Sequence, residues 1–176
     1  MDAKTRPISR LELRKLGKRM REAFAIEPGG ALPVLAMLDK LSDVLPGCKY
    51  VVVEDSELPP KTMAHCYLDG LGYTIKIKES VYAGAYEKNN GAFLGFICHE
   101  ICHVFLFMNG YAPILERSFE NFPVPAYRSV EWQAKALCGE VMVPFEESVG
   151  LSAGEIERRY LVSKAIAKYR WKLGRR

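Results

Sequence analysis

The longest apolar run of the chain extends from Ala92 to Met108, and His99, Glu100 and His103 interrupt it near its centre. A membrane-spanning helix would place these polar side chains in lipid, at a cost of about 3 kcal/mol for a charged group. The run therefore predicts a buried core helix, and we expect no membrane span.

The segment from His99 to His103 has the spacing of a helical metal site. Residues four apart lie about 40° from alignment and one turn apart, so both imidazoles can reach one ion. Glu100 lies about 100° around the helix, where it can act as general base beside the metal. We expect Zn²⁺ bound by His99 and His103, with Glu100 as the catalytic residue.

A catalytic zinc ion needs a third protein ligand as well as an open position. A third histidine at position 109 would be the metzincin arrangement, but that residue is Asn109. His65 could approach only from the sheet, so a later carboxylate is the better candidate. The carboxylates that qualify by position are Glu116, Glu120, Glu131 and Glu140.

Glu131 is preferred because it opens the next predicted helix, and a helical position fixes a ligand better than a loop. The helix dipole alone would also favour a glutamate there. Cys98 and Cys102 flank the histidines. Their thiols should point in a different direction from the two imidazoles. Buried free cysteine also commonly behaves as a small hydrophobic residue, so metal ligation by these thiols is the weaker hypothesis.

The length of 176 residues predicts a single domain, residues 1–176, with a helical pair at 1–46, the sheet and zinc site at 50–145, and a basic helix at 152–176. The five cysteines are odd in number, and no secretory signal is visible, so we expect a cytoplasmic protein. A net charge of +4 is small, and its basic residues concentrate near the ends, on faces expected to be solvated. Direct nucleic-acid binding is therefore not expected.

Hydrophobic spacing predicts helices over residues 9–25 and 33–45, the first with its apolar stripe in the core. Tyr50–Val53 is predicted as a buried strand, and Tyr73–Lys78 alternates like a strand with one face on the core. The second strand could alternatively be an edge that pairs with an extended substrate, but a plain sheet strand is the favoured interpretation. Residues 111–129 are predicted as a loop over the site.

These residues resemble the ImmA/IrrE family of metallopeptidases in three segments. The first is Ile97–His103. The second, Val130–Pro144, resembles the family's glutamate helix, and the third, Tyr160–Arg170, resembles its closing helix. The resemblance implies that Glu131 is the third zinc ligand. It also implies an α+β fold: a single zincin-like domain of the gluzincin type, mainly helical, with a small sheet beside the metal-binding helix.

The same resemblance implies an intracellular regulatory peptidase that cleaves a helix-turn-helix repressor or antitoxin. The alternative is a zinc-stabilised protein that sequesters such a regulator without cutting it. Lys135 stands where many members have an acidic or amide residue, and Cys102 where glycine is frequent. The sequence also has no clear oxyanion donor, for which Tyr111 and His65 are the candidates.

Overall fold

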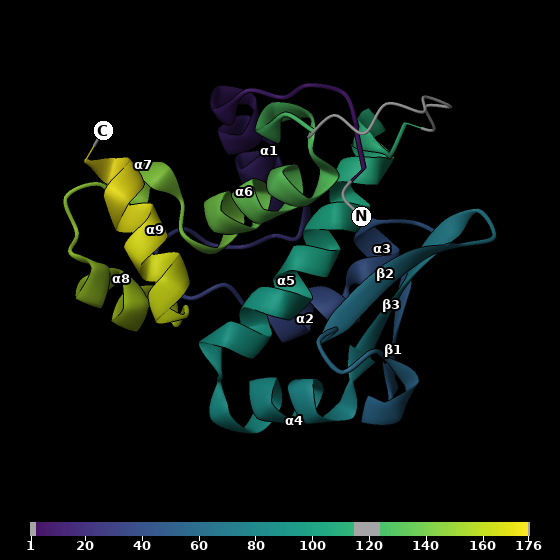
Figure 1. The fold of residues 1–176 in the computed structure, drawn as a ribbon. Helices are drawn as coiled ribbons and strands as arrows, with labels where there is room; N and C mark the ends of the chain where they lie inside the picture. Colours follow the sequence, from purple (N-terminus) through teal and green to yellow (C-terminus); the bar gives the residue numbers. More distant parts are fainter. Residues whose placement is uncertain (1–2, 115–123, 176) are drawn as a thin grey trace.

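The computed structural model describes residues 3–114 and 124–175, which form a mixed α+β fold (Figure 1). A three-stranded sheet lies on one side of α5, and α1 and α6 lie on the other. The helices are α1 (Arg10–Ala23), α2 (Val34–Asp39), α3 (Leu41–Val44), α4 (Glu79–Lys88), α5 (Gly91–Leu106), α6 (Val130–Met142), α7 (Phe145–Ser148), α8 (Ala153–Tyr160) and α9 (Lys164–Gly174).

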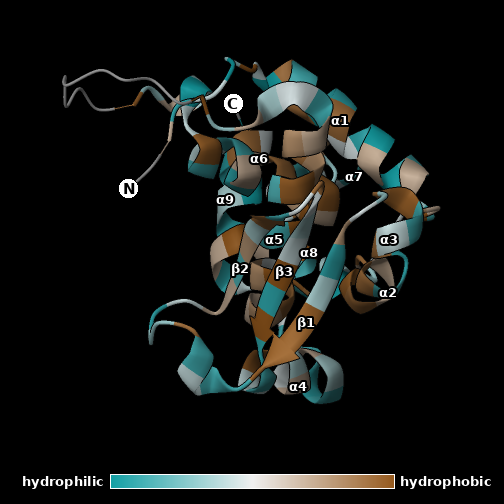
Figure 2. Cartoon of the chain, turned by 90° about the vertical axis from the view of Figure 1, so that its right-hand side faces the viewer, coloured by the Kyte–Doolittle hydropathy of each residue, from teal (hydrophilic) through white to brown (hydrophobic). Residues whose placement is uncertain are grey.

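The sheet has the strand order β1-β3-β2, seen face-on in Figure 2 with α5 behind it. Its strands are β1 (Lys49–Val53), β2 (Ala64–Asp69) and β3 (Gly72–Lys78). β1 runs parallel to β3, whereas β2 is antiparallel to β3 and joins it through a tight turn in which Gly70 has a φ of 65°. This turn requires the left-handed conformation that glycine tolerates best.

The strand predicted at Tyr73–Lys78 is confirmed, and it is the central strand of the sheet, so the alternative reading as a substrate-pairing edge is wrong. The strand predicted at Tyr50–Val53 is also confirmed, but the prediction that it is buried was wrong. It is an edge strand, and Val52 is 41% exposed. Strand β2, the other edge, was not predicted, and it lies beside α5.

Helix α5 is the centre of the core, as its apolar composition predicts. The Asn90 side chain caps its start by accepting hydrogen bonds from the backbone N–H groups of Ala92 and Phe93. After Leu106 the helix loosens into a turn that ends beyond Gly110, where φ is 87°. The segment Gly91–Tyr111 is long and apolar enough to cross a membrane, but most of it is buried inside the fold.

Helix α6 packs against α5 on one side and α1 on the other. Gly17 permits the close approach of α1, because a Cβ atom there would lie 3.0 Å from the Cβ of Glu140. Residues from all three predicted segments, 1–46, 50–145 and 152–176, contribute to one hydrophobic core. The site described below lies between α5, α6 and the edge strand β2.

Three helical predictions need correction. The helix expected over residues 33–45 is divided at Lys40 into α2 and α3. The expected last helix is divided into α8 and α9, because Leu161 adopts a left-handed conformation with a φ of 50°. The basic helices are not simply solvated, since Arg21 and Arg170 are buried.

Candidate metal centre

Helix α5 presents His99 and His103 on one face, one turn apart, as their spacing predicts. Their Nε2 atoms are 3.0 Å apart, and the ring planes are nearly perpendicular. His103 is buried, and His99 is more open to the cavity. Both imidazoles thus direct the same ring nitrogen at one point in space.

Glu131 approaches that point from the first turn of α6. Its Oε2 atom is 3.3 Å from Nε2 of His99, and its Oε1 atom is 3.3 Å from Nε2 of His103. The Ser129 side chain caps this helix by accepting a hydrogen bond from the backbone N–H of Trp132, which fixes the turn that carries Glu131. The carboxylate is 48% exposed, so its outer side faces solvent.

The three side chains fit a divalent metal ion. Their donor atoms lie within 4.8 Å of one another, and ligands of a tetrahedral zinc ion would be about 3.3 Å apart for bonds near 2.05 Å. Two imidazoles and one glutamate also form a known ligand set for catalytic zinc. The Nδ1 atom of His103 is buried and has no hydrogen-bond partner among the described residues, so no hydrogen bond at that nitrogen helps to orient the ring.

The protonation of Glu131 and that of His99 are linked in the metal-free protein. Hydrogen bonds from His103 and His99 lower the pKa of Glu131 far below its usual range. Burial opposes protonation of His99, but the hydrogen bond to Glu131 and the charge of Glu100 outweigh it and raise the pKa of His99. Glu131 is therefore ionised, and its negative charge favours the protonated form of His99.

Glu100 does not belong to the group of metal-ligating atoms. Its carboxylate is 9% exposed, and Oε2 accepts a hydrogen bond of 2.9 Å from the backbone N–H of Cys66 on β2. Burial and the adjacent Glu100 carboxylate raise the pKa of the Cys66 thiol, which keeps it protonated. Glu100 thus lies next to the candidate metal ligands on α5, and the hydrogen bond from β2 fixes its carboxylate.

The site opens into a cavity of about 1430 Å³. Residues of β2 form one wall, including Cys66 and Leu68, and residues of α6 and α9 form the other, including Trp132 and Tyr169. His99, Glu100, His103 and Glu131 all line it. The cavity is large enough to hold more than a single ion and a water molecule, and its walls are largely apolar.

The other predicted ligands lie elsewhere. Glu140 forms a buried bidentate ion pair with Arg170, at 2.7 and 2.9 Å, so it is not available to a metal at the histidines. His65 is exposed on β2 and lines the cavity without joining the metal-ligating group. Glu116 and Glu120 lie outside the described residues.

The structure also shows where Tyr111, a candidate oxyanion donor, and Lys135 lie relative to the site. Tyr111 is not among the residues that line the cavity and instead contacts the Arg6 guanidinium. Lys135 is exposed and lines the cavity one turn after Glu131, and within the described part of the chain it makes no ion pair or hydrogen bond with either histidine. It therefore does not orient the histidines, and its positive charge faces the cavity.

Two features of the site could not be read from side-chain patterns. The hydrogen-bond donor to Glu100 is a backbone group on a strand that lacks the apolar alternation of β3. The Cys98 and Cys102 thiols point away from the histidines, as expected, but meet a third thiol from Cys138 on α6. No model of a protein family matches this chain, and no curated protein matches it either.

Proposed function

We propose that this chain is a zinc-dependent peptidase with a zincin-like arrangement. The observation that carries the proposal is the convergence of His99 and His103 of α5 with Glu131 of α6, at distances of 3.0 to 3.3 Å, with Glu100 next to His99 on α5. Zinc-dependent peptide hydrolysis uses this combination of three protein ligands and one carboxylate that does not bind the metal.

The chain's own residues divide the work as follows. When bound, zinc would supply Lewis acidity at the scissile carbonyl and make water more acidic. Glu100 accepts the proton of the attacking water and returns it to the departing amine nitrogen. The Cys66 N–H holds Glu100 in place through its Oε2 atom.

The edge strand β2 offers a surface for an extended peptide. The Lys78 N–H donates to the Met63 carbonyl, so in this antiparallel pair the backbone groups of residues 65 and 67 also face β3. Those of Ala64 and Leu68 and the carbonyl of Cys66 face outward, toward the cavity, whereas the Cys66 N–H donates to Glu100. A substrate backbone lying there would pass directly beside Glu100 and His99.

The proposed substrate is a helix-turn-helix repressor or antitoxin in the cytoplasm. The support for this part is the resemblance of the residues around His99 and Glu131 to the ImmA/IrrE family. All five cysteines lie in the described residues and are unpaired, which agrees with a reducing compartment.

The test combines zinc analysis with a cleavage assay on a mixture of unstructured peptides carrying quenched fluorophores. We expect about one zinc per chain, with Glu100→Gln retaining zinc and losing at least about a hundredfold in cleavage rate. Glu146→Gln, on an exposed position of α7, is the matched control and should cleave like the wild type. Equal cleavage by Glu100→Gln would contradict the proposal.

A second function is distinguished by the same experiment. Should the zinc-loaded protein bind a purified helix-turn-helix regulator tightly but leave it and the peptides intact, the chain is a binding protein. The three ligands would then form a structural zinc site in which one coordination position of the ion is open to solvent.

A further inference from the structure

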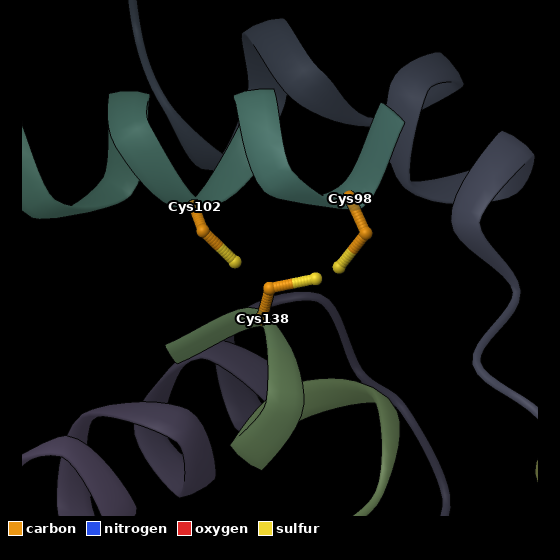
Figure 3. Close-up of side chains that lie close together, drawn as sticks. All are labelled: Cys98, Cys102 and Cys138. Carbon is orange, nitrogen blue, oxygen red and sulfur yellow. The ribbon is translucent and has the colours of Figure 1, made fainter. Parts of the chain in front are cut away.

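Three thiols from two helices meet in the core behind the histidine site. Figure 3 shows Cys98 and Cys102 of α5 and Cys138 of α6 pointing toward one another. Their sulfur atoms all lie within 4.8 Å of one another, and the residues are 0%, 0% and 5% exposed. Such a cluster concentrates soft ligand atoms in a place that bulk water does not reach.

A fourth sulfur atom extends this cluster. The Cys138 thiol donates to Sδ of Met142 at 3.7 Å, and Met142 is buried one turn further along α6. Each helix therefore contributes a pair of sulfur residues spaced by four, Cys98 with Cys102 and Cys138 with Met142. Residues spaced in this way share a helix face, and α5 and α6 pack directly against each other.

The thiol cluster is distinct from the candidate zinc site. Each histidine follows a cysteine by one residue, and this step turns the side chain about 100° around the helix. The imidazoles therefore face the cavity, and the thiols face α6. The sulfur atoms and the histidine–glutamate atoms accordingly form two separate groups of possible ligands.

We propose that Cys98, Cys102 and Cys138, with Met142 beside them, form a second metal site that binds one Cu⁺ ion. Thiolate and thioether sulfur select Cu⁺ over harder cations, and no imidazole or carboxylate belongs to this group. Zinc commonly takes four thiolate or imidazole ligands, and a thioether is a poor substitute for either. Binding releases the thiol protons, because the thiolates are the ligands.

Charge and access are compatible with this occupant. A Cu⁺ ion held by thiolates leaves a negative site, and the buried Arg21 guanidinium supplies a fixed positive charge near Cys98. Within the described residues Arg21 donates to the carbonyls of Val141 and Glu27, not to a carboxylate that would neutralise it. Cys138 also lines the cavity, which gives an ion a route to the cluster.

The test is an anaerobic titration of the full chain with Cu⁺ in competition with the chelator bathocuproine disulfonate. We expect one Cu⁺ per chain, and Cys138→Ser should weaken binding more than about a hundredfold, beyond the usual 10- to 100-fold effect of losing an outer-shell partner. Met142→Leu should weaken it less. Cys48→Ser, a buried cysteine outside the cluster, should bind like the wild type.

Further measurements separate this site from the zinc site and from misfolding. His99→Ala should lose zinc and keep Cu⁺, so the two proposals can fail independently. X-ray absorption of the copper-loaded wild type should show sulfur ligands alone. The proposal would be overturned by nitrogen ligands in the absorption spectrum, or by zinc competing on equal terms for the cysteines. It would also be overturned if Cys138→Ser kept the wild-type affinity for Cu⁺, or if Cys48→Ser lost as much of it as Cys138→Ser.

Discussion

The backbone N–H of Cys66 donates a hydrogen bond of 2.9 Å to the Glu100 carboxylate and so connects the edge strand β2 to the metal helix α5. Neither residue is a metal ligand in the arrangement proposed here. In the proposed function, this contact sets the distance between the edge strand that would bind a peptide and the carboxylate that would act as general base, and that distance must be correct for both to act on one substrate.

Replacing Cys66 with proline tests this contact, because proline removes the N–H group. That group faces away from β3, so the substitution costs no bond within the sheet, and proline is tolerated at such edge positions. A hydrogen bond to a charged group contributes about 1.5–3 kcal/mol, so we expect kcat to fall about tenfold or more while KM changes little. Steady-state kinetics on the quenched peptides measure this.

The control for the proline variant is Cys66→Ala, which keeps the N–H group and should retain kcat. Zinc content should equal that of the wild type in both variants. A similar loss of kcat in Cys66→Ala would mean that the thiol, and not the backbone group, matters at this position.

Glu131→Ala tests the third ligand. The variant should lose zinc during dialysis against a mild chelator, because two histidines alone leave the ion weakly held. Metal analysis of the dialysed protein gives the answer directly. Glu120→Ala is the comparison, as the rival predicted from sequence, and it should keep about one zinc per chain. If Glu120→Ala loses zinc and Glu131→Ala does not, the ligand assignment is wrong.

The sequence predicted the parts of the site that depend on local spacing. Positions four apart in a helix must share a face, so His99 and His103 converge whatever the rest of the fold does. Glu131 was preferred because it opens a predicted helix, but the helix dipole could also explain a glutamate there, so the resemblance to a family was needed to strengthen the choice. The structure brings Glu131 to the histidines and pairs Glu140 with Arg170.

The remainder depends on tertiary packing that has no local signal. Strand β2 carries His65 and Asp69 among its apolar residues, so it shows little alternation, and it forms because β3 offers it a partner. Cys138 meets Cys98 only because α6 packs on α5. The breaks at Lys40 and Leu161 likewise interrupt helices whose apolar spacing continues through them.

Glu140→Ala should lower the free energy of unfolding by about 3–5 kcal/mol, because it leaves the buried Arg170 guanidinium without its carboxylate. Zinc binding at pH 7 should persist in the folded fraction, which separates this residue from the ligands. Denaturant unfolding followed by circular dichroism measures the change. Glu146→Ala, at an exposed position, should stay within about 0.5 kcal/mol of the wild type, and a small effect of Glu140→Ala would contradict a structural ion pair.

Zinc affinity should depend on pH through His99. Zinc needs the neutral imidazole, and in the metal-free protein the hydrogen bond to Glu131 and the charge of Glu100 raise the pKa of His99 above its ordinary value of 6.5. Below that raised pKa each zinc must displace a proton from His99, so affinity should fall about tenfold per pH unit as pH drops, and above it this dependence should disappear. Glu131 adds no such proton, because its pKa is lowered and it stays ionised.

Glu100→Gln provides the matched test of that pH dependence. Glu100 is one of the charges that raise the pKa of His99, and it is not a ligand, so its neutral variant should move the break in affinity to lower pH. Chelator competition between pH 5 and 8 measures the break in both proteins. A break at the same pH in both would show that the charge of Glu100 does not act on His99, and an upward shift would reverse the sign of the proposed coupling.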